Sequence, residues 1–88
     1  MRFGDYEVTV NPESYPGQGE RYEIAFPNGY GASIVRGPHT YGGPAGLWEL
    51  AVLKGDDLTY DTPITTDVEG HLTEGDVEGL LTRIEALT

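Results

Sequence analysis

The sequence predicts an α+β domain, a small antiparallel sheet of about five strands with one C-terminal amphipathic helix packed on a face. Two observations lead to this prediction. Over residues 20–61, short apolar runs alternate with turns rich in glycine and proline, which is typical of strands joined by tight turns. Residues 73–87 instead carry apolar side chains at helical spacing. At 88 residues the chain makes one domain, in which residues 1–19 add an accessory strand and loop.

Alternation of apolar and polar residues marks the first two predicted strands. Residues 5–10 and 20–26 both alternate, as expected of strands with one buried face. The apolar residues on that face are Tyr6, Val8 and Val10 in the first strand, and Tyr22, Ile24 and Phe26 in the second. Residues 11–19 hold two prolines and two glycines, so we expect a loop there. The pair Asn28-Gly29 then marks a hairpin turn, because both residue types tolerate positive φ.

The centre of the predicted sheet follows this hairpin. Residues 32–36 form a third strand and residues 47–54 a fourth. The fourth is apolar on both faces except for Glu49, so we expect it to be central and covered on both sides, or on one side and by a partner. A fifth strand is expected at 57–60, and one helical turn over 66–72.

The C-terminal helix has a clear start and a clear apolar stripe. Thr73 is a suitable N-cap, and Asp76 three residues later completes a pattern resembling a capping box. The stripe consists of Val77, Leu80, Leu81, Ile84 and Leu87. Gly75 and Gly79 weaken the helix by about 1 kcal/mol each relative to alanine, so packing against the sheet must compensate.

The charge balance narrows the class of partner. Fifteen acidic residues against five basic ones give a net charge of −10. This argues against direct binding of nucleic acid, which needs a basic patch, and against anionic membrane surfaces. It favours a protein partner with a basic surface, because complementary fields speed encounter. The alternative is that the acidity serves solubility alone.

The candidate partner-binding residues follow from this charge and from exposed aromatic positions. They are Tyr30, Tyr41, Asp56, Asp57, Asp61, Asp67, Glu69, Glu74, Glu78 and Glu85. On a helix, Glu74, Glu78 and Glu85 fall within about 40° of one another, beside the apolar stripe. Such a row of carboxylates could imitate phosphates, or it could be a solvated face whose first acids favour the helix dipole.

The sequence offers only weak candidates for a catalytic or metal-binding site. The chain has no cysteine, which excludes thiolate catalysis and cysteine-based zinc sites. A metal site could combine His71 with Asp67 or Glu69, and Asp67 and His71, four residues apart, would share a helix face. Zinc usually takes three or four ligands, so we expect a surface histidine and no metal. Glu49 is the carboxylate that lies within an apolar run. A catalytic acid of a glycosidase needs such surroundings to raise its pKa, but we interpret Glu49 as an outward-facing strand residue or as a partner of Arg36. We therefore expect no enzyme and no cofactor.

Four blocks of the sequence resemble a family of small acidic proteins encoded by bacteriophages and prophages. They read NGYGASIV at 28–35, YGG at 41–43, GLWELAVL at 46–53 and LTYDTPIT at 58–65. The resemblance extends from Tyr22 to Leu87 and leaves the N-terminal strand and loop outside it. The family has no assigned activity, so the resemblance implies a phage origin and no catalytic residue.

Together these observations predict a non-enzymatic phage protein that binds a host protein through acidic and aromatic surface. Inhibition of a nucleic-acid-binding defence complex is one such role, comparable to anti-CRISPR proteins and DNA mimics. The alternative is a structural or housekeeping phage protein that forms a homo-oligomer by pairing sheet edges. Because no signal peptide or membrane-spanning run is recognised, we expect the chain in the cytoplasm of the host cell.

Overall fold

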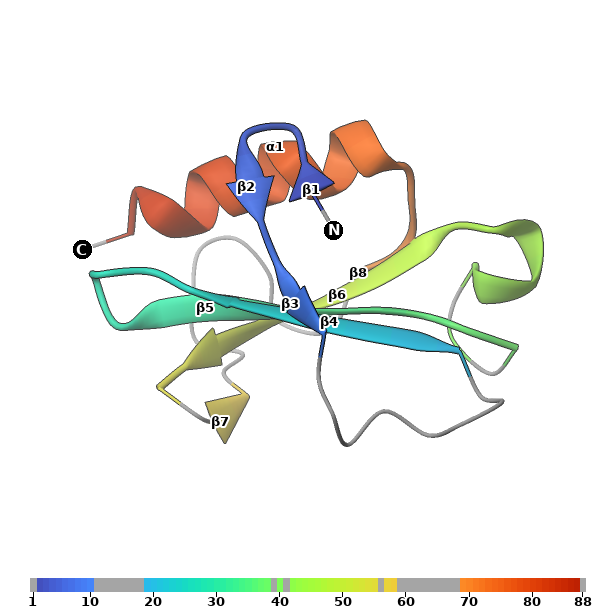
Figure 1. The fold of residues 1–88 in the computed structure, drawn as a ribbon, viewed down its shortest axis with the longest axis horizontal. Coiled ribbons are helices and arrows are strands. Elements are labelled where there is room, and N and C mark those ends of the chain that lie inside the picture. Colours follow the sequence, from blue (N-terminus) through green and yellow to red (C-terminus); the bar gives the residue numbers. More distant parts are fainter. Residues whose placement is uncertain are drawn as a thin grey trace.

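The computed structural model confirms the α+β class, with an antiparallel sheet covered on one face by a C-terminal helix (Figure 1). It describes residues 2–10, 19–38, 40, 42–55, 57–58 and 69–87. The elements are β1 (Arg2–Phe3), β2 (Tyr6–Glu7), β3 (Thr9–Val10), β4 (Glu20–Ala25), β5 (Tyr30–Arg36), the 3-10 turn η1 (Gly43–Ala45), β6 (Trp48–Lys54), β7 (Asp57–Leu58), β8 (Glu69–Leu72) and α1 (Glu74–Glu85).

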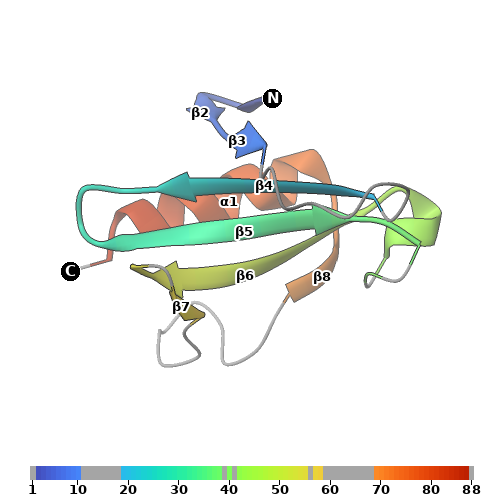
Figure 2. The same cartoon turned by 60° about the horizontal axis from the view of Figure 1, so that its bottom comes forward.

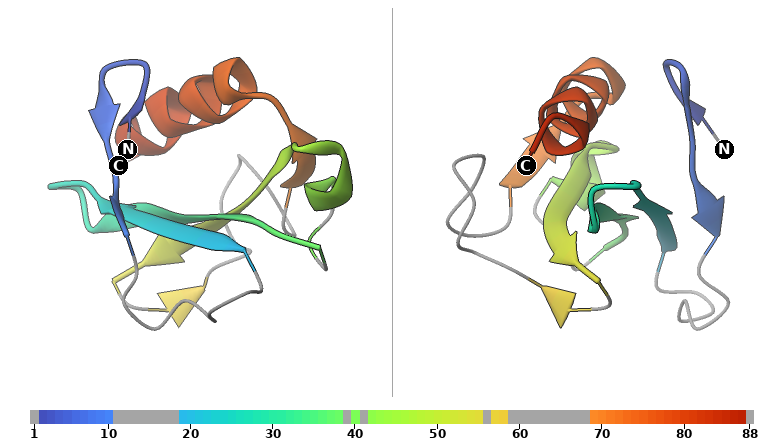
Figure 3. Two further views of the ribbon diagram at one scale, coloured as in Figure 1. Left: turned by 45° about the vertical axis from the view of Figure 1, so that its right-hand side comes forward. Right: turned by 90° about the vertical axis from the view of Figure 1, so that its left-hand side faces the viewer.

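The sheet runs in the order β3-β4-β5-β6-β7, and β8 pairs with the same strand β6. All of these pairs are antiparallel, and the register sets Ile34 of β5 between Tyr22 of β4 and Leu50 of β6. Strands β1 and β2 form a separate hairpin, which lies beside α1 on the same side of the sheet (Figures 2 and 3). One face of the sheet therefore carries both the helix and the N-terminal hairpin.

The turn between β4 and β5 shows how the local sequence sets the register. The Gly29 N–H donates to the Phe26 carbonyl at 3.1 Å, and the Phe26 N–H donates to the Tyr30 carbonyl at 2.8 Å. Gly29 has φ 88°, a conformation that glycine adopts without a steric penalty. Pro27 and Asn28 occupy the two preceding positions, so the expected Asn-Gly turn is a three-residue loop with a bulge at glycine.

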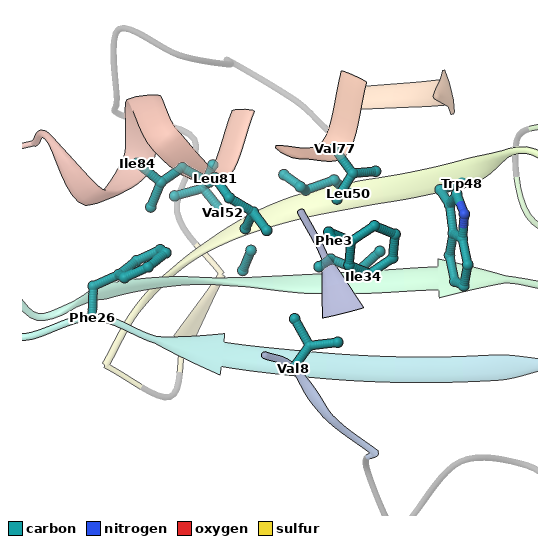
Figure 4. Packing of buried hydrophobic residues seen from close by; sticks show 11 residues of the cluster. Phe3, Val8, Phe26, Ile34, Trp48, Leu50, Val52, Val77, Leu81 and Ile84 are labelled. Atoms are coloured by element: carbon teal, nitrogen blue, oxygen red, sulfur yellow. The ribbon is translucent and has the colours of Figure 1, made fainter. Parts of the chain in front are cut away.

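The core lies between the sheet and α1 (Figure 4). Strand β6 is central, as expected, and presents its buried Trp48, Leu50 and Val52 to this face. The helix contributes Val77, Leu81 and Ile84, all fully buried, while Leu80 and Leu87 of the predicted stripe are partly buried at its margins. Helical spacing in the sequence thus identifies the residues that α1 buries.

The N-terminal segment supplies part of this core. Phe3 is fully buried and its ring meets Trp48 edge-to-face, with centroids 5.1 Å apart and an interplanar angle of 83°. Val8 is also buried in the same cluster. The single strand expected at 5–10 is wrong, because pairing is interrupted at Val8: β2 pairs with β1, and β3 pairs with β4. Val10 is 65% exposed at the end of the segment instead of facing the core.

The helical turn expected over 66–72 is also wrong in its described part, since Glu69–Leu72 form strand β8. The edge of β6 near Trp48 and Leu50 is open to another strand. Pairing with it gives the backbone N–H and C=O groups of β8 hydrogen-bond partners that an isolated helical turn would lack. The pairing is irregular between Trp48 and Leu50, and His71 has φ 56°. The predicted fifth strand is seen as β7, Asp57–Leu58, and its expected continuation to 60 lies outside the described residues.

Candidate functional site

The start of α1 is organised by a capping box, as the sequence predicts. The Thr73 hydroxyl accepts a hydrogen bond from the Asp76 N–H at 3.1 Å, and the Asp76 carboxylate accepts one from the Thr73 N–H at 3.0 Å. The backbone hydrogen bond from Thr73, and then its hydroxyl, hold the pKa of Asp76 below its ordinary value. Glu74 follows the cap and is exposed, so carboxylates gather at the positive end of the helix dipole.

The predicted row of helix carboxylates is divided by the N-terminal hairpin. The Tyr6 hydroxyl lies 3.0 Å from Glu85 Oε1, within hydrogen-bonding distance. Glu78 lies against the turn between β1 and β2, where a side chain in place of Gly4 would collide with its carboxylate. Glu78 and Glu85 therefore help to seat the hairpin on α1. Glu74 and Glu85 are exposed and Glu78 is half-buried, and of the three Glu74 is the one for which no contact with the hairpin is seen among the described residues.

Most basic residues are engaged within the molecule. Arg2 pairs with Glu7 at 3.1 Å, Arg21 with Glu23 at 3.7 Å and Arg36 with Glu20 at 2.7 Å. Lys54 Nζ lies 5.9 Å from the centre of the Tyr30 ring, a cation–π distance. Within the described ranges, Arg83 is the basic residue without such a contact.

Arg36 is held in a row of side chains that crosses three strands. Register places it directly between Glu20 and the position of Trp48, and its guanidinium lies 4.1 Å from the centre of the Trp48 ring. Glu49 is adjacent to Trp48 in sequence and faces the other side of the sheet, so the suggested Arg36–Glu49 pair is wrong and Glu20 is the partner. Burial, and then a hydrogen bond to Glu20, raise the pKa of Tyr22 beside this row.

The structure locates some of the other predicted site residues. Tyr30 begins β5 and is half-buried, and Glu69 is half-buried in β8. Asp57 belongs to β7, and its side chain lies outside the described part of the chain. Four further candidates also lie outside the described residues, namely Tyr41, Asp56, Asp61 and Asp67. The described candidates are thus spread over the sheet end, β8 and one flank of α1.

The possible metal pair does not form on a helix. His71 and Glu69 lie in β8, and Asp67 falls outside the described residues, so the helix spacing that linked them is absent. Among the described residues no group of three or more potential ligands could hold a metal ion. Ser33 is buried in β5, and His39 also lies outside the described residues.

The described surface includes hollows that join distant elements. One, of about 450 Å³, lies between β8 and the start of α1, and Glu69, Leu72 and Arg83 are among its lining residues. Another, of about 490 Å³, lies across one end of the sheet between Glu7 and Leu53. Sequence reasoning missed both, because each is formed by elements that are far apart in the chain.

Sequence reasoning also missed how α1 ends. The Asn28 side-chain amide Nδ2 lies 2.9 Å from the Ile84 carbonyl, 3.1 Å from that of Glu85 and 2.9 Å from that of Leu87. Its Oδ1 accepts a hydrogen bond from the Tyr30 N–H at 2.9 Å, which fixes the orientation of the amide. Carbonyls at the last turn of a helix lack partners within the helix, so Asn28 acts as a cap supplied by a different element.

Comparisons with known proteins identify no relative of this chain. A scan against protein-family models, a search of curated proteins and a search of solved structures each found no match. Among the described residues, no helix is long and apolar enough to cross a membrane. The functional proposal below therefore rests on the charges and contacts of the described side chains.

Proposed function

We propose that this chain is a non-enzymatic phage protein that binds a basic surface of a host protein, such as a nucleic-acid-binding defence complex, through its acidic surface. The observation that carries the proposal is the internal engagement of the basic residues. Arg2, Arg21 and Arg36 each pair with a glutamate of the same molecule. Each pair cancels one charge of each sign, so the pairs leave the net charge of −10 unchanged.

The acidic surplus is accessible in the described part of the chain near the start of α1. Glu74 is exposed there, and Glu69 lies at the half-buried edge formed by β8. Uncompensated charge of one sign attracts a partner of the opposite sign and raises the rate of association. Tyr30 and Tyr41 are the aromatic residues proposed to anchor the partner once it has docked. We place the binding event in the cytoplasm of the host cell.

The experiment that tests this proposal begins with capture of the partner from a host lysate by the immobilised chain. Association is then measured with the purified partner at 50 mM and 500 mM salt. Steering by charge weakens as the Debye length falls from about 14 Å to about 4 Å between these conditions. We expect the variant Glu69→Gln/Glu74→Gln to associate several-fold more slowly than the parent at low salt, with a smaller difference at high salt.

A matched variant separates local charge from total charge. Asp5→Asn/Glu7→Gln removes the same number of charges from the N-terminal hairpin, and Asp5 and Glu7 are both exposed. We expect this variant to associate faster than Glu69→Gln/Glu74→Gln. The proposal is contradicted if association is insensitive to salt and both variants behave as the parent does, because the acidity would then serve solubility.

A further inference from the structure

The groove between β8 and α1 lies on the flank of the helix opposite the N-terminal hairpin. At 100° per residue, Val77, Leu81 and Ile84 define the core face of α1. Glu78 and Glu85 lie on one side of this face and contact the hairpin. The other side opens into the groove of about 450 Å³. One flank of α1 is therefore covered and the other is open among the described residues.

The surface of this groove has an apolar centre with opposite charges at its two ends. Leu72 and Leu80 line it beside Gly79. Asp76 lies toward the N-terminal end of α1, and Arg83 lies toward the C-terminal end. Glu69 adds a second carboxylate at the acidic end. Arg83 is also the basic residue that has no ion pair or ring contact within the described ranges.

This distribution of charge is self-complementary under a two-fold rotation. If two copies of α1 cross antiparallel at Gly79, residue 83 of each lies level with residue 75 of the other. These positions are eight residues apart, which corresponds to about 12 Å along a helix. Arg83 of one copy then meets the acidic end of the second copy, and the symmetry repeats the contact. A partner that is only basic would meet Arg83 with the wrong sign.

The fold itself does not require the glycines on this flank. Among the described residues, a Cβ at Gly79 would meet nothing within 4 Å, and at Gly75 the nearest atom would be Thr73 Oγ1 at 3.9 Å. Neither residue has positive φ. Both lower helix propensity without an intramolecular benefit. An approaching second helix accounts for them, because the absence of side chains lets Leu80 and the stem of Arg83 from the other copy pack closely.

We propose that this groove is the contact surface of a two-fold symmetric dimer of this chain. In the dimer, α1 of one copy lies antiparallel on α1 of the second copy, and Arg83 of each reaches Asp76 and Glu69 of the other. Two copies with a charge of −10 each repel one another at long range, so the dimer forms more readily at moderate salt than at low salt. The dimer does not depend on the function proposed above: it engages Glu69 of each copy and leaves Glu74, which does not line the groove, to face a basic host protein.

Sedimentation equilibrium of the full chain tests the dimer directly. The measurement covers protein concentrations from about 5 to about 500 μM in 150 mM NaCl, a range chosen because small interfaces give weak dimers. We expect the mass to rise with concentration from 9.6 kDa toward twice that value. A mass that stays at 9.6 kDa over the whole range overturns the proposal.

Paired variants then locate the contact. Gly79→Gln fills the groove, and we expect it to weaken dimerisation at least tenfold without lowering the thermal unfolding temperature. Ala45→Gln also replaces a small residue by glutamine, but at the exposed turn η1, away from the groove. This variant should dimerise as the parent does. If Gly79→Gln and Ala45→Gln dimerise equally, the copies associate through another surface and the proposal is overturned.

A charge swap tests the cross-contact specifically. Arg83→Glu should weaken the dimer, because like charges then face each other across the two-fold axis. Adding Glu69→Arg to this variant places a positive charge beside Asp76, at the end of the groove that faces residue 83 of the other copy, so we expect dimerisation to recover in part. If the double variant is weaker than Arg83→Glu alone, Arg83 does not reach Glu69 of the second copy and the proposed arrangement is wrong.

Discussion

Asn28 connects two parts of the fold through a single side chain. Its amide donates to carbonyls at the end of α1, while its oxygen accepts from the backbone of β5. The side chain belongs to a turn whose shape is set by Pro27 and Gly29. A residue favoured locally by turn geometry thus also holds the C-terminal end of the helix against the β4–β5 hairpin.

Replacing Asn28 by Asp should therefore destabilise the protein by about 1–3 kcal/mol. The aspartate keeps the acceptor for the Tyr30 N–H but loses the donors to the helix carbonyls, and it places a negative charge at the negative end of the helix dipole. Urea unfolding at pH 7 measures the loss. An unchanged midpoint would show that the amide contributes nothing to holding α1.

His71 has a backbone conformation that is unfavourable for a residue with a side chain. It is the non-glycine residue with positive φ among the described residues, and it occurs where the pairing of β8 with β6 is irregular. Its backbone is closely opposed to Gly42, where an added Cβ would lie 2.8 Å from the His71 Cα. The close approach explains why residue 42 is a glycine in this loop.

At the scale of the element, α1 is stabilised mainly at its ends and along its buried stripe. Thr73 and Asp76 cap its start, and Asn28 caps its end. The helix interior contains Gly75 and Gly79, which lower its intrinsic stability. A helix of this length is marginal in water by itself, so these contacts with caps and sheet decide whether it forms.

The start of α1 should be sensitive to its cap. We expect Thr73→Ala to cost about 1 kcal/mol, because the Asp76 N–H loses its acceptor. The loss should appear in the urea unfolding midpoint and in the helical circular dichroism signal before the cooperative transition. Thr73→Ser keeps the hydroxyl that accepts this hydrogen bond and is the comparison for the loss of the threonine methyl group. Equal losses in the two variants would contradict a capping role.

The cap should also depend on pH through Asp76. Hydrogen bonds from Thr73 lower the pKa of this carboxyl in the folded state below its ordinary value of 3.8. A lowered pKa contributes stability that is present above pH 3.8 and is lost as the pH falls through the folded value. Asp76→Asn should therefore be less stable than the parent at pH 7, and the difference should shrink by pH 3. A difference that is the same at both pH values would contradict this assignment.

At the scale of the whole molecule, the core joins three segments that are distant in the chain. Phe3 comes from the N-terminal hairpin, Trp48 from the central strand and Leu81 from the helix. Leu81 is fully buried, so Leu81→Ala should cost about 2–5 kcal/mol. Leu80→Ala should cost less, because Leu80 is only partly buried. A denaturation midpoint unchanged by Leu81→Ala would contradict the packing of α1 on the sheet.

The N-terminal hairpin should be required for stability. Phe3 is fully buried against Trp48, so we expect Phe3→Ala to cost about 3–5 kcal/mol in chemical denaturation. Val10→Ser changes an apolar residue of the same segment that is 65% exposed, and it should alter stability by less than about 0.5 kcal/mol. If both variants unfold at the midpoint of the parent, the hairpin does not contribute to the core.

The sequence by itself determined the elements whose signal is local. Periodicity located the helix and its buried face, and Thr73 with Asp76 defined the start of the helix. Alternation and the Asn28-Gly29 turn located β4 and β5, and the apolar run at 47–54 predicted the central strand. These predictions succeeded because hydrogen bonds and side-chain direction repeat over a few residues within one helix or strand.

Only the tertiary structure decided which distant segments meet. The open edge of β6 made Glu69–Leu72 a strand where local spacing favoured a helical turn. The core at Trp48 made Phe3 a buried residue, although its surroundings in the sequence are polar. The groove beside Gly79, and the contact of Glu85 with Tyr6, likewise depend on how the hairpin and β8 flank the helix. Such contacts are set by complementary surfaces between elements, which no window of neighbouring residues records.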